Sequence, residues 1–326
     1  MSILSKKKYF RDRPDGTFVK TVDSIHIVMA HLLPKRTEAE VYSLEKIDVT
    51  RLLRFIDEKN AGNKEYTTTL FHAVITAMFK TIYNRPLMNR FIAGKRYYDR
   101  NDISISFVIK NAFTDTAEER ILIIRAENTM TFSSVSKKIY DEVHEVRSSN
   151  SNPTNEIIEK VVRLPKPVFS LFAWAYLHLD KHGWIPESLW KNDQNFTTVL
   201  VSNLGSIGAG ACHHHLNNYG TNSIMITIGE IKKEYVMDKT GTVHEKDYVE
   251  IGITVDERIA DGFYFAKSFD QMKYFLTHPH LLEEPVSTPF IQWEKTPVPE
   301  PSGQKIKESL SVKDAAHLYS LPIKNR

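Results

Sequence analysis

VEIGITVDERIADGFYFAKSF, residues 249–269, is the stretch that decides the fold of this chain. Its first part alternates apolar residues with small or polar ones up to Val255, a pattern that predicts a half-buried strand. After Gly262 the apolar residues recur at helical spacing, so residues 256–261 form a charged turn between a strand and a helix. Taken alone, this turn is either a solvated cluster of ion pairs or part of an active site.

The composition is typical of a globular protein, and its overall charge does not indicate a particular class of binding partner. The chain has 326 residues, of which 41% are hydrophobic, enough for one large or two ordinary domains. Its net charge of +3 gives no argument for nucleic-acid binding. The single cysteine, Cys212, excludes an intrachain disulfide and a cysteine-based zinc site, and with no secretory signal it predicts a cytoplasmic protein. The most apolar segment, residues 169–179, is too short to span a bilayer, so we expect a buried helix and no membrane partner.

Strands and helices are expected to intermix along the chain without a strict β-α-β alternation. Apolar runs and alternation predict strands in residues 41–47, 102–110, 120–127, 196–204, 223–237 and 247–255. Helical spacing behind capping residues, with Asp48 as one expected N-cap, predicts helices in residues 49–60, 67–85, 133–149, 156–165 and 262–285. This mixture predicts an α/β (α+β) fold, a two-layer sandwich with a mixed sheet.

The chain is expected to divide into three parts of different composition. Residues 1–22 are expected to form a polar, basic N-terminal arm, and residues 23–285 the compact domain. Residues 286–326 are rich in proline and polar residues, which predicts an extended C-terminal extension, with a short docking helix in residues 313–321.

Two further motifs lie between the expected strands. VSNLGSIGAG, residues 201–210, places Ser202 before a glycine-rich turn whose spacing does not match a dinucleotide fingerprint, and alone it is typical of an ordinary strand-end turn. The histidines His213, His214 and His215 follow it. In an extended segment only the first and third share a face, so a metal would need a third ligand from elsewhere. These residues are therefore either polar loop histidines or part of a metal site.

The order of these blocks resembles a known family. A strand ending in SNLGSIG, a strand ending in Ile228-Gly229, a hairpin and a strand ending in D-x-R-x-x-D-G are similar to the acyltransferase domain of the lipoyl acyltransferase subunits of 2-oxo acid dehydrogenase complexes. More distantly, the chain is similar to chloramphenicol acetyltransferase. The blocks KIDVTRLLRFIDEKN, TTTLFHAVITAMFK, PLMNRFI and DISISFVI also occur in the family's order, so the resemblance covers residues 23–285. It implies a chloramphenicol acetyltransferase-like fold and acyl transfer between coenzyme A and a second acceptor.

The resemblance also assigns roles to individual residues. In the family the turn reads D-H-R-x-x-D-G, where the histidine removes the thiol proton, and the serine of S-N-L-G hydrogen-bonds the oxyanion. By resemblance Ser202 is that serine, Asp261 supports the turn, and Glu257 stands in the place of the histidine. The other assigned residues are the turn-supporting Asp256, Arg258 and Gly262, the substrate-binding Asn203, Gly205 and His213, and His214 and His215 as alternative bases.

The exchange of histidine for Glu257 changes the expected rate. Passing a proton from a thiol of pKa ~8.5 to a histidine of pKa ~6.5 is uphill by about 2.7 kcal/mol, and passing it to a glutamate of pKa ~4.3 is uphill by about 5.7 kcal/mol. The difference of about 3 kcal/mol corresponds to about a hundredfold in rate. An apolar surrounding raises the pKa of a carboxylate and recovers most of this difference, whereas pairing with an arginine lowers the pKa again.

Three functions are compatible with these motifs. The first is an acyltransferase with an altered base, with coenzyme A as substrate and no bound metal. Only residues 1–22 precede the domain, too few for a lipoyl module, so the acceptor is a lipoyl group on another protein or a free small molecule. The second is a catalytically inactive relative that acts as an oligomeric scaffold or binding protein. The third is a metal hydrolase centred on His213 and His215.

The resemblance has two further implications for assembly. It implies a homotrimer, or a multiple of trimers, with the active site between subunits. The apolar segment at residues 169–189 has no clear counterpart in the shorter family members, and we expect it to add to the core, to form an oligomer contact or to cover the substrate channel as a lid.

Overall fold

A computed structural model describes residues 11–62, 65–110, 119–148 and 163–290 of the chain. The chain divides into one compact unit, Met1–Pro289, and a second unit, Phe290–Arg326. All described helices and strands belong to the first unit. The helices expected in residues 156–165 and 313–321 lie wholly or largely outside the described residues.

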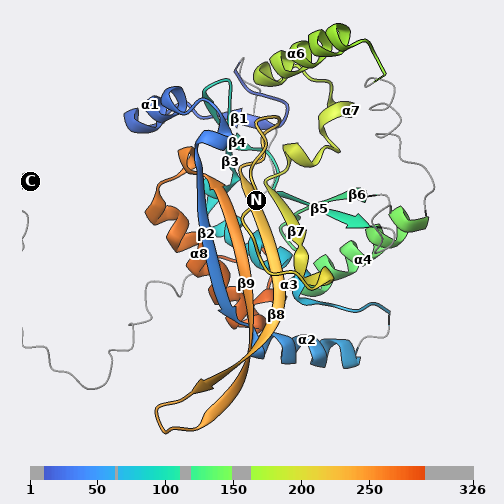
Figure 1. Cartoon of the computed structure of the whole chain (residues 1–326), viewed down its shortest axis with the longest axis vertical. Helices are drawn as coiled ribbons and strands as arrows, with labels where there is room; N and C mark the ends of the chain where they lie inside the picture. The colour runs from blue at the N-terminus through green and yellow to red at the C-terminus, as the bar shows by residue number, and fades with distance from the viewer. Residues whose placement is uncertain (1–10, 63–64, 111–118, 149–162, 291–326) are drawn as a thin grey trace, which may run out of the picture. The chain divides into compact units, whose positions relative to one another are not determined.

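A mixed six-stranded sheet forms the centre of the first unit (Figure 1). Its strand order is β2-β9-β8-β7-β5-β6, and β7 runs parallel to both of its neighbours whereas the other pairs are antiparallel. The strands are β2 (Glu40–Asp48), β5 (Ser104–Lys110), β6 (Glu119–Arg125), β7 (Val199–Asn203), β8 (Ile224–Met237) and β9 (Val243–Asp256). The predicted strands and the mixed sheet are therefore confirmed.

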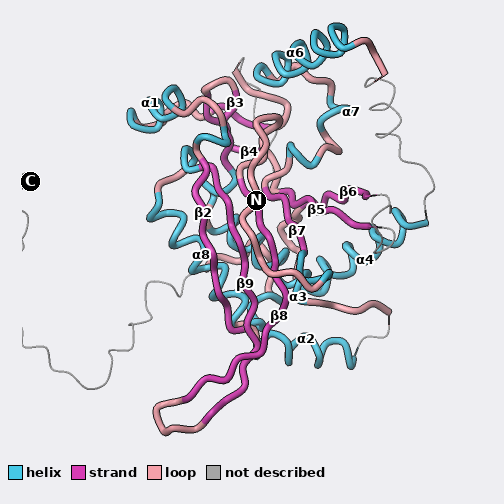
Figure 2. The backbone as a smooth tube through the Cα atoms, viewed as in Figure 1, coloured by secondary structure: helices cyan, strands magenta, loops and turns pink. Residues whose placement is uncertain are grey.

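Helices make the second layer, on one face of this sheet (Figure 2). They are α2 (Thr50–Gly62), α3 (Leu70–Asn84), α4 (Phe132–Ser148) and α8 (Gly262–Thr277). The central helix, α3, is buried along most of its length because α4 and α8 pack on either side of it. Asp48 is expected from the sequence to begin a helix. It accepts a hydrogen bond of 3.1 Å from the N–H of Thr50, the first residue of α2. The two-layer sandwich predicted from the sequence is thus confirmed.

A small sheet corrects the expected N-terminal arm. Its strands are β1 (Gly16–Phe18), β4 (Arg96–Arg100) and β3 (Arg90–Ala93), in the order β1-β4-β3. Arg13 and Asp15 are buried and form an ion pair of 2.7 Å, and Arg13 reaches Asp180 at 3.3 Å. The described part of residues 1–22 is therefore packed against the domain, because its charges find buried partners.

The apolar segment forms a helix, as predicted, but the helix is not buried. Helix α6 (Lys166–His182) buries only Asp180, while Leu171 and Trp174 are 65% and 64% exposed. A short helix, α7 (Glu187–Trp190), follows it. The expectations of a buried helix and of added core are therefore wrong for this chain, and the oligomer contact and the lid stay as predictions.

In the parts of the chain that the structure describes, no helix combines the length and the apolar character needed to cross a bilayer.

One half-buried histidine predicts how stability depends on pH. Burial lowers the pKa of His72, in the first turn of α3, to about 4, and its Nδ1 accepts a hydrogen bond from the Thr69 N–H at 3.0 Å. Because the pKa is about 6.5 in the unfolded chain, the unfolded state binds more protons between these values, so stability is complete above pH 6.5 and falls as the pH drops towards 4.

His72→Gln should remove that part of the pH dependence, since glutamine at this position also accepts the capping hydrogen bond. Urea unfolding at pH 7.0, 5.5 and 4.5 measures it. Identical slopes for the parent and the variant would contradict the assignment.

Candidate functional site

The charged turn at residues 256–261 is built around a buried ion pair. Strand β9 ends at Asp256, and a short 3-10 turn, Glu257–Ile259, follows. Asp256 accepts hydrogen bonds from Arg258 Nε at 2.7 Å and from Arg258 Nη2 at 2.6 Å, and the two side chains are 0% and 2% exposed. The third arginine nitrogen, Nη1, donates to the Leu33 carbonyl at 2.7 Å. The cluster is therefore structural and buried, not a solvated set of ion pairs.

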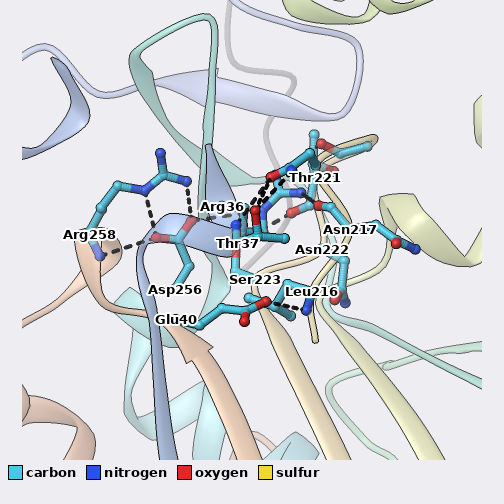
Figure 3. A network of polar contacts seen from close by, with 12 residues as sticks. Arg36, Thr37, Glu40, Leu216, Asn217, Thr221, Asn222, Ser223, Asp256 and Arg258 are labelled. Atoms are coloured by element: carbon cyan, nitrogen blue, oxygen red, sulfur yellow. Dashed lines mark hydrogen bonds and ion pairs between the residues drawn. The ribbon is translucent and has the colours of Figure 1, made fainter. Parts of the chain in front are cut away.

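A second buried arginine connects this turn to the segment that carries the histidines (Figure 3). Arg36 lies 3.8 Å from Asp256 Oδ2 and donates to the carbonyls of Asn217 and Gly220. Burial lowers the pKa of Arg36 to about 10, and the charge of Asp256 opposes that shift. Asp256 is thus shared by two arginines that reach it from different parts of the chain.

A pocket of about 530 Å³ opens beside this turn, between helix α1 (Ser24–Leu32), strand β2 and the start of α8. Most of its lining is apolar, and its larger apolar side chains are Ile25, Met29, Val41, Val255, Phe265 and Phe269. The carboxylates of Glu45, Glu257 and Asp261 also line it. Such a lining, apolar with a few polar groups, is typical of a small-molecule site.

Glu257 is the carboxylate that the fold leaves free. Its backbone N–H donates to the Ala39 carbonyl at 2.9 Å, which fixes the backbone position. Its side chain lines the pocket and makes no hydrogen bond or ion pair with any described residue. Arg258 does not pair with it, because Asp256 occupies that guanidinium. The side chain at position 257 is therefore available to a ligand.

Asp261 begins helix α8. Its Oδ1 accepts a hydrogen bond from the Tyr264 N–H at 2.7 Å, the geometry of an N-cap. Gly262 is the first residue of the helix. The turn thus has a fixed end on each side of Glu257, the ion pair of Asp256 and the cap of Asp261.

Ser202 does not meet Glu257 within one chain. Ser202 pairs with Thr227 of β8, and Thr227 pairs with Gly252 of β9, whereas Glu257 lies beyond the end of β9. The neighbouring Asn203 ends β7, and neither Ser202 nor Asn203 is among the described residues that line the pocket.

Gly205 follows Asn203 in a 3-10 turn that lies against β8. A Cβ atom at this position would lie 2.5 Å from the Gly229 carbonyl, so only glycine fits. The sequence assigned Gly205 to substrate binding, and its observed role is this close approach of two backbones.

The three histidines have different surroundings. His213 Nε2 contacts the Ser43 carbonyl at 3.1 Å, and its ring lies 5.3 Å from that of Tyr42; both of these β2 residues line the pocket. His214 and His215 stack on each other at 4.6 Å and are exposed. Of the three, His213 is therefore the one beside the pocket of Glu257.

The third function predicted from the sequence, a metal hydrolase, requires a cluster of metal ligands. In the described ranges, no group of three or more histidine, cysteine, aspartate or glutamate side chains is placed to hold a metal ion.

Two residues of this site, Arg36 and His26, could not be predicted from the sequence pattern. Both residues lie in segments without a motif. Arg36 acts through contacts with residues far along the chain, and His26 lines a pocket that forms only when three elements come together. A lone arginine in a polar stretch has no periodicity that distinguishes a buried side chain from a solvated one. Only the tertiary structure brings Arg36 to Asp256.

Comparison with solved structures defines the class of fold. A probable dihydrolipoamide acetyltransferase from Listeria monocytogenes aligns with a TM-score of 0.53 at 15% identity, covering 81% of this chain and 95% of its own. The dihydrolipoamide acetyltransferase of Azotobacter vinelandii aligns with the same TM-score at 14% identity, covering 81% of this chain and 93% of its own. The fold is therefore that of acyltransferase catalytic domains.

Sequence comparison confirms the resemblance stated from the motifs. Residues 187–283 match the family model of the 2-oxoacid dehydrogenases acyltransferase (catalytic domain). A curated relative, the lipoamide acyltransferase component of the branched-chain alpha-keto acid dehydrogenase complex of Bacillus subtilis, is 20% identical over 250 residues, which cover 74% of this chain and 48% of the relative. The chain thus spans about half the length of that relative.

Proposed function

We propose that this protein transfers an acyl group between coenzyme A and a small acceptor, with Glu257 as the base. The observation that carries the proposal is the free carboxylate of Glu257 in an apolar pocket, inside the region that matches the acyltransferase family model. The position of Glu257 at the end of β9 is fixed by its backbone and by the Asp256–Arg258 pair. A fixed, unpaired base at a pocket is the minimum that general-base catalysis requires.

The study of the Azotobacter vinelandii enzyme supports the choice of residues. In that enzyme, a serine, a histidine and an asparagine have been investigated for their role in the catalytic mechanism, and the histidine and the asparagine are four positions apart. In this chain Ser202, Glu257 and Asp261 take these places by motif, and all three lie within residues 187–283. We therefore propose Ser202 as the oxyanion donor and Asp261 as the residue that holds the turn.

The proposed reaction with a thiol acceptor balances without a further reagent. The thiol proton passes to the Glu257 carboxylate, and the sulfur attacks the acyl carbonyl to form a new C–S bond. The Ser202 hydroxyl donates to the oxyanion of the tetrahedral intermediate. When the intermediate collapses, the C–S bond to coenzyme A breaks and Glu257 returns its proton to the leaving thiolate. The products are the acyl thioester and free coenzyme A.

Because Ser202 and Glu257 lie apart in one chain, we propose that the site forms between subunits of a trimer. One of the similar solved structures is the cubic core of the pyruvate dehydrogenase multienzyme complex. Light scattering with mass measurement should give three chains or a multiple of three. A stable monomer that is fully active would contradict the shared site.

The test of the function is acyl transfer by the purified protein. Acetyl-coenzyme A is incubated with thiol, amine and hydroxyl acceptors, and free coenzyme A is measured by chromatography, which avoids interference from Cys212. We expect slow turnover with at least one acceptor, and a loss of at least tenfold in Ser202→Ala. Ser206→Ala is the matched control, because Ser206 is exposed on the turn that follows Ser202 and its hydroxyl donates to the Asn203 carbonyl. No turnover together with no binding of coenzyme A by calorimetry would contradict the proposal.

The second candidate function is an inactive relative that serves as an oligomeric scaffold or binding protein. It is favoured by one observation, the carboxylate that replaces the family's histidine at position 257. Its signature is a trimer that binds coenzyme A or another ligand without turnover, so the same incubation and light scattering distinguish the two candidates.

A further inference from the structure

The charges that face the pocket have one sign. Three carboxylates line it, from Glu45, Glu257 and Asp261, and among the described residues no lysine or arginine lines it. The histidine in the lining, His26, is held by Asp23 through a contact of 2.6 Å between Nδ1 and Oδ2. Hydrogen bonds from His26 lower the pKa of Asp23, so that the pair adds no net positive charge to the rim.

These three carboxylates differ in the hydrogen bonds and ion pairs that the protein supplies to them. Burial works against the charge of Glu45, but hydrogen bonds from Lys273 at 2.7 Å and Ser43 at 2.6 Å lower its pKa and neutralise the site. Asp261 accepts the capping hydrogen bond of α8. Glu257 has no partner among the described residues. Of the three, Glu257 is therefore the carboxylate that a ligand can pair with without displacing a contact to a described residue.

The remaining lining is apolar and partly aromatic. The rings of Phe265 and Phe269 in α8 stack at a centroid distance of 6.1 Å, and Ile25 and Met29 of α1 also line the pocket. An apolar wall near a carboxylate disfavours an anionic ligand, because both charges would lose water without gaining a partner. A ligand with an apolar body and a protonated amine satisfies both parts, through a charge-assisted hydrogen bond and contact with the rings.

We infer that this pocket binds a small amphipathic amine in its cationic form, with the ammonium group on Glu257 and the apolar body between α1 and α8. The inference deepens the proposed function, because it names the class of acceptor that the proposed function leaves open. Only the statement that the bound amine is the acyl acceptor rests on the proposed function. Binding itself requires no turnover and no coenzyme A.

The experiment compares three probes of similar shape by calorimetry at pH 7 without coenzyme A: 2-phenylethylamine, 2-phenylethanol and 3-phenylpropionate. The amine should bind at least tenfold more tightly than the alcohol, and the carboxylate most weakly. In Glu257→Gln the amine and the alcohol should bind equally, with the affinity for the alcohol unchanged. Glu58→Gln, an exposed carboxylate on α2, should leave the preference as in the parent.

Several results would overturn the inference. These are equal affinities in the parent, a preference for the amine that survives Glu257→Gln, tightest binding of the carboxylate, or no binding of any probe. Thermal unfolding of Glu257→Gln verifies that the variant is folded. Because coenzyme A is absent, a protein that fails to transfer acyl groups still reports on this pocket, so the two proposals fail separately.

Discussion

Replacing Asp256 by alanine should lower the free energy of unfolding by about 3–5 kcal/mol, since it leaves two buried arginines without their shared carboxylate. Asp256 receives two hydrogen bonds from Arg258 and lies 3.8 Å from Arg36. Both arginines are almost fully buried, so water cannot replace the lost partner. Urea unfolding followed by fluorescence and circular dichroism measures the change.

Two further variants distinguish a specific charge network from a general sensitivity of the domain. Arg258→Met should cost less than Asp256→Ala, because Asp256 keeps Arg36 nearby when Arg258 is removed. Asp57→Ala, at an exposed position of α2, should change stability by less than about 0.5 kcal/mol. A loss below 1 kcal/mol in Asp256→Ala, or the reverse order of the two network variants, would contradict this account.

Replacing Glu257 by histidine should raise acyl transfer to a thiol acceptor about a hundredfold at pH 7. The reason is the proton transfer, which is about 3 kcal/mol less uphill with histidine than with an ordinary glutamate. The surroundings permit the exchange, because no described residue depends on the Glu257 side chain. The measurement is kcat/KM from the release of coenzyme A.

The matched variant Glu257→Gln keeps the size of the side chain and removes the base, so it should abolish the parent's activity. The two proposals about this side chain predict different effects of Glu257→His. The proposed function predicts faster acyl transfer to a thiol, and the proposed amine site predicts weaker binding of the amine. If parent and Glu257→His are equally fast, Glu257 is not the base. If only Glu257→His is active, the parent is the inactive relative.

The elements along the chain were largely predictable, because alternation and helical spacing report on local burial. The strands on either side of the hairpin, β8 and β9, and the helix after Gly262 follow directly from the sequence pattern. Helix α6 shows the limit of the same argument. Its composition predicts burial, but burial depends on what lies opposite, and within the described structure only Asp180 of this helix is fully buried.

The site was predictable only in part, for a related reason. The motif located Glu257 and the residues on either side of it, since they are contiguous in sequence. It could not locate Arg36, or the α1 residues of the pocket, because these contacts join segments about two hundred residues apart and leave no periodic signal. The sequence of three adjacent histidines does not show which of them lies near the pocket. In the structure, the contact with the Ser43 carbonyl distinguishes His213 from His214 and His215.

The turn after β9 separates what holds the fold from what is presented to a ligand. Asp256 and Arg258 hold the backbone on one side, and Asp261 caps the helix on the other, while the side chain between them supports none of these contacts. Within this turn, the folding contacts therefore depend on Asp256, Arg258 and Asp261, and none of them depends on the side chain at position 257. A single substitution at position 257 can therefore change the group presented to the pocket and leave every described contact of the turn in place.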